Sequence, residues 1–322
     1  MNHNENKLKV GILGYGKIAH TTSPHFPNYS LSHLTAILKN QKLQVNAIFE
    51  PHPVDILKEH AHYFFTSNEN EFWSKQNDLV VIASPTAFHL KQLKKAIESH
   101  TPYILLEKPF GHSKEEIDEF QKIIDHNYKT GTSKIILNLP RHFDLAHRSL
   151  YERIKKNEFG KPLTFSAHLT KGLIHNGIHM LDLISNCFGN DFDIFPLNII
   201  KAEHDILGLV NFKSKEGEGT INCLPSGDYS LFELVIYFEQ AKISIINNGR
   251  IIQILKATTS NLYQHFKELN QLDCIEETYQ DAIDQVYLNL LSLDHFTLYS
   301  KLNHWLELNC KLINIKDNYD NK

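Results

Sequence analysis

The chain has 322 residues, of which 42% are hydrophobic and 22% are charged, and its formal net charge is -4. This length exceeds what one hydrophobic core usually organises, so we expect two domains. The absence of a basic excess argues against a nucleic-acid partner, because gripping a phosphate backbone requires clustered positive charge.

No apolar stretch in the sequence reaches signal-peptide or membrane-span length. Met1 to Lys9 is polar, and no window approaches the roughly 18 uncharged apolar residues that a membrane span requires. The four cysteines lie far apart without a Cys-x-x-Cys pair, which is typical of reduced thiols. We therefore expect a cytoplasmic protein with no membrane partner.

The first half of the chain alternates short apolar runs with helical patterns. Five runs predict buried strands: Leu8 to Leu13, Val45 to Phe49, Leu79 to Ala83, Tyr103 to Leu106 and Ile135 to Leu139. Residues 88–97 and 117–124 carry apolar side chains at helical spacing, and Ser113 with Glu116 predicts the start of the second helix. This order predicts a βαβ series with a parallel sheet.

After Pro140 the pattern changes to consecutive short strands. Helices are predicted near 150–154 and 178–187, and strands at 163–169, 205–212, 219–224, 231–238, 242–246 and 251–255. Turns such as Asn247-Asn248-Gly249 indicate an antiparallel sheet. Helices at 276–291 and 294–308 could cover that sheet or return to the first domain. We predict domains at 1–139 and 140–322.

A glycine-rich turn follows the first strand. In the sequence Gly14-Tyr15-Gly16-Lys17-Ile18-Ala19, the first glycine permits a tight turn, the second lets a pyrophosphate approach, and the small Ala19 allows close packing of helix on strand. We expect this turn to bind a dinucleotide through Gly14, Gly16, Lys17 and Ile18.

The second strand ends in Glu50. Its carboxylate can accept hydrogen bonds from the adenosine ribose hydroxyls and repels a 2′-phosphate, which favours NAD over NADP. NADP stays open as a cofactor, because the segment from Ala19 to Glu50 is longer than in the compact motif and His52 lies nearby.

Polar segments also follow two later strands. Ser84-Pro85-Thr86 follows residues 79–83, and Glu107-Lys108-Pro109 follows residues 103–106. Both should face the nucleotide, because open α/β sheets bind ligands at the carboxyl ends of their strands. The predicted cofactor contacts therefore also include Ser84, Pro85, Thr86, His89, Glu107 and Lys108.

Taken together, these motifs resemble the Gfo/Idh/MocA family of oxidoreductases. The likeness rests on the glycine turn, the segment Ser84 to His89 and the Glu-Lys-Pro segment. It continues through residues 141–144, 158–162 and 177–182, in the family's order and spacing. It implies an α/β chain: an N-terminal Rossmann domain followed by an α+β domain with a largely antiparallel, open-faced sheet.

The resemblance also implies site residues. Lys108 would contact substrate and nicotinamide, and His179 would act as acid or base on the reacting hydroxyl or carbonyl. His175 stands where many members have an aspartate, which leaves the proton relay open. A cis peptide is implied before Pro109.

The site chemistry agrees with these residue types. Hydride transfer from a C–O–H group needs a base for the hydroxyl proton, as His179 could supply, and a cation for the developing alkoxide, as Lys108 could supply. Arg141, Lys171 and Asn176 are further candidate substrate ligands, which fits a sugar, polyol or nucleotide-sugar. His175 and His179 lie four apart, but we predict no metal, because Gly177 disfavours a continuous helix there.

We therefore predict an NAD(P)-dependent dehydrogenase or reductase acting on a secondary alcohol or ketone. The alternative is a catalytically inactive dinucleotide-binding regulator of the same fold. An open sheet face in the second domain would be costly to leave in water, so we expect a homodimer or homotetramer.

Overall fold

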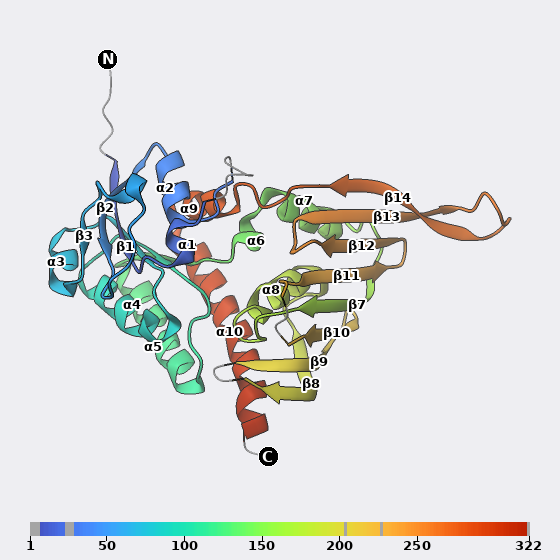
Figure 1. Cartoon of the computed structure of the whole chain (residues 1–322). Helices are drawn as coiled ribbons and strands as arrows, with labels where there is room; N and C mark the ends of the chain where they lie inside the picture. Colours follow the sequence, from blue (N-terminus) through green and yellow to red (C-terminus); the bar gives the residue numbers. More distant parts are fainter. Residues whose placement is uncertain (1–6, 23–28, 203–204, 226–227, 321–322) are drawn as a thin grey trace. The chain divides into compact units, whose positions relative to one another are not determined.

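The computed structural model describes residues 7–22, 29–202, 205–225 and 228–320 (Figure 1). The chain falls into two compact units. One comprises the chain up to Pro140 together with Gln280–Leu306, and the other comprises Arg141–Tyr279 and the chain from Glu307 onward. Residues 280–306, which the sequence analysis grouped with the second domain, therefore lie in the first unit.

The first unit contains a parallel sheet that, in the described chain, has the strand order β3-β2-β1-β4-β5-β6. Its strands are β1 (Leu8–Leu13), β2 (Leu43–Phe49), β3 (Phe65–Thr66), β4 (Leu79–Ile82), β5 (Tyr103–Leu106) and β6 (Lys134–Leu137). The four residues of β4 are all fully buried, because helices cover both faces of the sheet. The predicted parallel sheet of a Rossmann domain is confirmed.

Some of the described helices of this unit start at a side-chain cap. They are α1 (Lys17–His20), α2 (His33–Lys39), α3 (Glu69–Ser74), α4 (His89–Glu98), α5 (Lys114–Thr130) and α9 (Ala282–Ser292), with single turns η1 (Lys58–His60) and η2 (Thr86–Phe88). The Ser113 side chain accepts from Glu116 N and caps α5. The Glu116 carboxylate instead accepts from His112 N at 2.7 Å, so the reciprocal half of the predicted capping box is absent.

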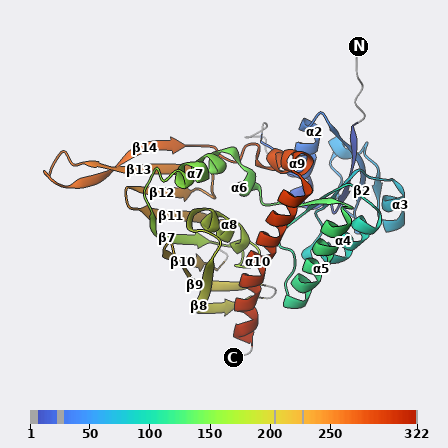
Figure 2. The same cartoon turned by 180° about the vertical axis from the view of Figure 1, so that it is seen from behind.

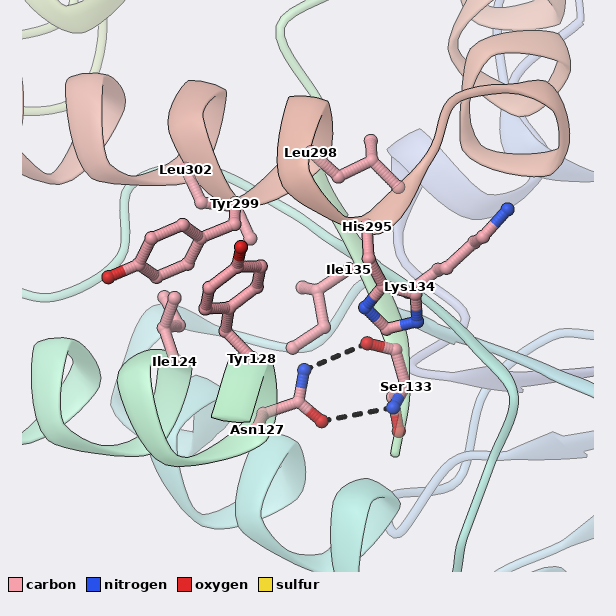
Figure 3. A pocket seen from close by; sticks show the side chains of 10 residues that line it. All are labelled: Ile124, Asn127, Tyr128, Ser133, Lys134, Ile135, His295, Leu298, Tyr299 and Leu302. Atoms are coloured by element: carbon pink, nitrogen blue, oxygen red, sulfur yellow. Dashed lines mark hydrogen bonds between the residues drawn. The ribbon is translucent and has the colours of Figure 1, made fainter. Parts of the chain in front are cut away.

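The structure settles where the two C-terminal helices go. α9 packs against β5, β6 and α2 of the first unit. The following helix, α10 (His295–Asp320), begins in that unit, where Tyr299 stacks on Tyr128 at 4.0 Å and donates to Asp125 at 2.9 Å (Figure 3). Asn127 pairs with the backbone of Ser133 beside this contact. The segment thus returns to the nucleotide domain.

The second unit holds the other sheet, ordered β14-β13-β12-β11-β7-β10-β9-β8 in the described residues. Its strands are β7 (Pro162–Leu169), β8 (Phe192–Lys201), β9 (Ile206–Ser214), β10 (Glu218–Cys223), β11 (Phe232–Phe238), β12 (Ala241–Ile246), β13 (Ile251–Thr259) and β14 (Lys267–Ile275). Adjacent strands are antiparallel except β7 with β10, so the predicted largely antiparallel sheet is confirmed.

The two edge strands β8 and β14 escaped the sequence analysis. β8 contains Pro196, where its pairing with β9 shifts register, and most of its residues are exposed. Proline is tolerated on an edge strand because no inner partner needs its missing N–H. β14 is likewise largely exposed, so neither segment shows the alternation by which strands are recognised.

Within the described residues, helices cover one face of this sheet and leave the other face open. Along β11, Phe232, Leu234 and Ile236 are buried, whereas Val235 and Tyr237 on the opposite face remain partly open. Helices α7 (Leu145–Lys155) and α8 (Gly177–Phe188) lie on the covered side (Figure 2). The short helix α6 (Pro140–Phe143) precedes them. Among the described helices, none combines the length and apolarity of a membrane span.

Candidate functional site

The glycine turn at the end of β1 has the two glycines where they are needed. Gly14 has φ +99°, and a Cβ there would lie 2.8 Å from the carbonyl oxygen of Ala83. A Cβ on Gly16 would meet nothing within 4 Å. The first glycine is therefore required by the fold, whereas the second leaves open space over the turn, as a dinucleotide cradle would require.

The helix opened by this turn is shorter than the motif predicts. α1 has four residues, Lys17–His20, and ends at Thr21, whose hydroxyl donates to Lys17 O at 2.6 Å. Lys17 is exposed and Ile18 half-buried. The next described helix is α2, beginning at His33. The additional length between Ala19 and Glu50 thus includes the second described helix, α2.

Glu50 lies at the tip of β2, as predicted, and its carboxylate also supports the glycine turn. It accepts from Tyr15 N at 3.0 Å and from His52 N at 3.1 Å. This second role was not apparent in the sequence, because Tyr15 N is brought to Glu50 only by the parallel pairing of β1 with β2. The same carboxylate faces the pocket over the turn.

That pocket has a volume of about 630 Å³ and lies entirely within the first unit. It is lined by the glycine turn, the tip of β2 and the tip of β4: Gly14, Gly16, Phe49, Glu50, Pro51, His52, Glu69, Ala83, Ser84, Pro85, Phe88, Lys91 and Gln92. Of the predicted cofactor residues, the structure brings Gly14, Gly16, Glu50, Ser84 and Pro85 together here.

An aromatic cluster beneath the turn was missed by the sequence analysis. Tyr15 is buried, stacks on His20 at 4.4 Å and forms a 2.7 Å hydrogen bond with His60 Nδ1. Burial raises the pKa of Tyr15 and lowers that of His60. The cluster ties the turn to residues 57–60, because Leu57 N also donates to the Tyr15 hydroxyl.

The segment after β4 is linked to the segment after β5 through His89. This side chain is 1% exposed, with Nε2 2.9 Å from Ser84 O and Nδ1 3.0 Å from Pro109 O. Burial lowers its pKa, although the two carbonyls oppose that shift. The hydrogen-bond partners of His89 are thus two backbone carbonyls, one in the segment after β4 and one in the segment after β5. Direct contact of His89 with a cofactor stays a prediction. Thr86 begins the turn η2 nearby.

The Glu107-Lys108-Pro109 segment follows β5. The Lys108–Pro109 peptide is cis, which confirms the implied conformation. The Lys108 side chain is half-buried, whereas Glu107 is 7% exposed and accepts from His33 Nε2 and Asn138 Nδ2. Burial by itself raises the pKa of Glu107, but these donors outweigh it and the pKa is lowered. Glu107 is therefore an ionised carboxylate beside Lys108.

In the second unit, His179 lies in the first turn of α8 and is 6% exposed. One turn later on the same helix, Asp182 accepts from His142 Nδ1 at 3.0 Å. His175 precedes the helix and is exposed, and its backbone N donates to Asp205 at 2.9 Å. His175 and His179 are therefore not on one helical face. No group of three potential His, Cys, Asp or Glu metal ligands occurs among the described side chains.

The remaining predicted substrate ligands have structural partners within the second unit. Arg141 donates to Asn248 O at 2.8 Å and lies 4.0 Å above the Phe232 ring. Burial lowers its pKa, against the opposing effect of Tyr279. Asn176 precedes α8 and donates to Thr170 O, and Lys171 is exposed with φ +70°. Their contacts with substrate stay predictions.

Lys108 belongs to the first unit and His179 to the second. Contact of both side chains with one substrate stays a prediction.

Comparisons with known proteins agree with the architecture of both units. Residues 8–133 match the family model described as "Oxidoreductase family, NAD-binding Rossmann fold", GFO_IDH_MocA. A search of curated protein sequences gave no match to the chain.

Solved structures share the fold over most of the chain. A dehydrogenase from Chromobacterium violaceum is 14% identical, with 98% of each chain covered and a TM-score of 0.67. A myo-inositol dehydrogenase from Corynebacterium glutamicum is 17% identical, with 96% of each covered and a TM-score of 0.64. The WlbA dehydrogenase from Bordetella pertussis, solved with NADH and UDP-GlcNAcA, is 15% identical, with 75% of this chain and 79% of that chain covered and a TM-score of 0.60.

Proposed function

We propose that this chain, whose residues 8–133 belong to the Gfo/Idh/MocA oxidoreductase family, transfers hydride between a nicotinamide and a secondary alcohol or ketone of a sugar-like substrate. The observation that carries the proposal is the pocket of about 630 Å³ over the glycine turn. It joins the turn to the tip of β4, and the next strand of the sheet, β5, is followed by Glu107 and Lys108.

Two features of the pocket support the binding of a dinucleotide. Gly16 leaves open space above the turn, and Glu50 offers a carboxylate at the tip of β2. The pyrophosphate would lie against Gly14 and Gly16, and the adenosine ribose against Glu50. Ser84 and Pro85 line the same pocket at the tip of β4.

We infer that NAD is preferred over NADP, because Glu50 would repel a 2′-phosphate. Replacing Glu50 with Gln keeps an acceptor for Tyr15 N but removes the charge. We expect the ratio of the NADP Kd to the NAD Kd to fall at least about tenfold, equivalent to roughly 1.4 kcal/mol. Fluorescence titration with both dinucleotides measures it. Glu69→Gln is the matched control, since Glu69 lines the same pocket but pairs with Lys91; an unchanged ratio in Glu50→Gln would refute this preference.

Three groups take part in the proposed hydride transfer: the nicotinamide, His179 and Lys108. When bound, the oxidised nicotinamide supplies the acceptor for the hydride of the alcohol carbon. His179 takes the hydroxyl proton as general base and returns it in the reverse direction. Lys108 holds the negative charge that develops on the oxygen. Both side chains suit these roles, because Lys108 is only half-buried at a strand tip and His179 lies at the start of a helix.

The substrate class is proposed from the candidate ligands and from the relatives' names. Lys171, Asn176 and Arg141 bring cationic and amide donors to the second unit, which suits a polyhydroxylated substrate. Two structures of the same fold are named as acting on myo-inositol or as binding UDP-GlcNAcA. A polyol, sugar or nucleotide-sugar is therefore the class to test first.

The test is turnover of NAD with a panel of sugars, polyols and nucleotide-sugars. Growth of absorbance at the reduced-nicotinamide wavelength on one substrate supports the proposal. Tight NAD binding with no turnover on any member of the panel, together with a protein partner in pull-down, would instead support the catalytically inactive regulator.

We further propose that the chain self-associates through the open face of the second sheet. That face carries apolar side chains, among them Val235 and the 41% exposed Tyr237. Figure 1 also shows the β13–β14 hairpin reaching well beyond the other strands of its sheet, with apolar Leu262, Tyr263 and Phe266 exposed at its tip. Such surfaces are costly to leave in water.

We therefore expect a sedimenting mass that is a multiple of the 37.2 kDa chain. Val235→Glu places a charge on the open face between the uncharged cross-strand neighbours Ser166 and Ser244, and we expect it to weaken the oligomer at least about tenfold, since an unpaired interface charge is costly. Leu288→Glu, at an exposed position on α9, should leave the mass unchanged. A wild-type monomer at micromolar concentration would refute the proposal.

A further inference from the structure

A buried chain of polar contacts runs into Glu107 from the helices of the first unit. The hydroxyl of Tyr287 on α9 lies 3.0 Å from His33 Nδ1 on α2. His33 Nε2 lies 3.0 Å from Glu107 Oε1, and Asn138 Nδ2 donates to the same oxygen at 2.5 Å. His33 and Tyr287 are fully buried. We refer to Tyr287, His33 and Glu107 as the buried relay.

The hydrogen-bond donors and acceptors of the relay can be assigned from the carboxylate outward. A carboxylate can only accept, so His33 Nε2 must carry a proton. If His33 is neutral, Nδ1 is then an acceptor and the Tyr287 hydroxyl donates to it. This leaves one negative charge, on Glu107, next to the ammonium of Lys108 in sequence. Both ring nitrogens of His33 are thereby satisfied inside the protein.

The segment that carries His33 is fixed independently of the glycine turn. Ser30 donates to the Asp284 carboxylate on α9 at 2.6 and 2.7 Å, and Ser30 N donates to Gln280 O at 2.9 Å. Ser32 caps α2 through the backbone N of Thr35. The additional residues between α1 and β2 therefore place His33 beside the carboxyl end of β5, which Glu107 and Lys108 follow. Contacts with α9 hold His33 in that position.

We infer that His33 is a positioning residue for the proposed hydride transfer: in its neutral Nε2–H tautomer, fixed by Tyr287, it holds Glu107 in one orientation and so fixes the backbone that presents Lys108. The inference rests on the proposed function for its catalytic consequence. The relay itself is a property of the folded chain. Glu107 N also donates to Ile82 O at 3.0 Å, so a displacement of this strand end would be felt at the neighbouring β4 tip as well.

The relay gives activity a pH dependence whose sign follows from its contacts. Donation by His33 and Asn138 keeps the pKa of Glu107 below its usual range. The other ionisable groups facing this carboxylate are Lys108, His89 and, through His33, Tyr287. Asp284 lies behind Tyr287 on α9. Removing the His33 donor takes away a hydrogen bond to the charged form, so Glu107 would protonate at higher pH.

The experiment compares kcat for reduction of the ketone against pH for wild type, His33→Leu, His33→Gln and Tyr287→Phe. In this direction His179 acts as an acid, so its ionisation limits the basic side of the profile and leaves the acid limb to Glu107. We expect His33→Leu to move the acid limb of kcat upward by about one pH unit, since hydrogen bonds to a carboxylate shift its titration on that scale. His33→Gln can still donate to Glu107 and should restore most of the wild-type profile. Tyr287→Phe should shift the acid limb in the same direction but less, because it removes only the hydroxyl that fixes the His33 tautomer and leaves His33 itself in place.

His147→Leu is the matched control. His147 is a fully buried histidine paired with a carboxylate, at 2.7 Å from Asp144, but in the second unit. It should lower the melting temperature without moving the acid limb. If His33→Leu lowers the melting temperature in the same way and leaves the limb in place, His33 is merely structural and the inference is wrong.

A second measurement separates this inference from the proposed function. Nitrogen-15 NMR of the histidine rings in the protein without substrate, with His33 assigned by its loss in His33→Gln, reports the tautomer directly. An Nε2–H neutral ring near pH 7 that becomes mixed in Tyr287→Phe supports the relay, even if no substrate is turned over and the proposed function fails. A protonated or Nδ1–H ring overturns the relay whether or not the protein is active.

Discussion

Replacing Lys108 with Met is expected to lower kcat at least about a hundredfold and to change the NAD Kd less than about threefold. Removing a single group that stabilises developing negative charge costs on the order of 10²–10³ in kcat. Met preserves most of the apolar length of the side chain, and the backbone of the cis peptide is untouched. Steady-state kinetics on the best substrate of the panel, with fluorescence titration for NAD, measures both quantities.

The control for this variant is Lys129→Met. Lys129 is an exposed lysine in the last turn of α5 and does not line the pocket over the glycine turn. It should behave as wild type in both assays. Equal kcat in Lys108→Met and wild type would remove Lys108 from the mechanism, whereas loss of NAD binding in Lys108→Met would show that its principal role is in holding the cofactor.

Alanine at the two glycines of the turn should have opposite effects on stability and binding. Gly16→Ala places its Cβ in open space, so the melting temperature should hardly change. The NAD Kd should rise at least about tenfold, because the methyl group occupies the approach of the pyrophosphate. Gly14→Ala is strained at φ +99° and drives Cβ against the Ala83 carbonyl, so we expect destabilisation of about 1–3 kcal/mol.

Thermal unfolding and NAD titration of the two variants decide between a nucleotide cradle and a purely structural turn. A stable Gly16→Ala protein that binds NAD as tightly as wild type would contradict the cradle. Comparison with Gly131→Ala supplies the reference for a left-handed glycine away from the pocket. Gly131 lies at the C-terminal end of α5 with φ +64°, and a Cβ there would meet nothing within 4 Å.

The sequence was most informative about the first sheet. Its inner strands β4 and β5 are continuous apolar runs because both faces are covered, and such runs are recognisable without knowledge of their neighbours. The glycine turn could be recognised equally well from the sequence, because Gly14 and Gly16 indicate a local backbone geometry. The lengths of the two C-terminal helices and the exposed edge strands β8 and β14 were less so, because exposure removes the hydrophobic signal on which recognition depends.

The sequence by itself determined the parallel nucleotide-binding sheet, the placement of Glu50 and Lys108 at strand ends, and the antiparallel character of the second sheet. Tertiary structure alone decided that α9 returns to the first unit and that His33 and Tyr287 meet Glu107. The physical reason is separation along the chain: periodicity and turn chemistry act over a few residues. A contact between positions 33, 107 and 287 exists only once α2, β5 and α9 have packed together.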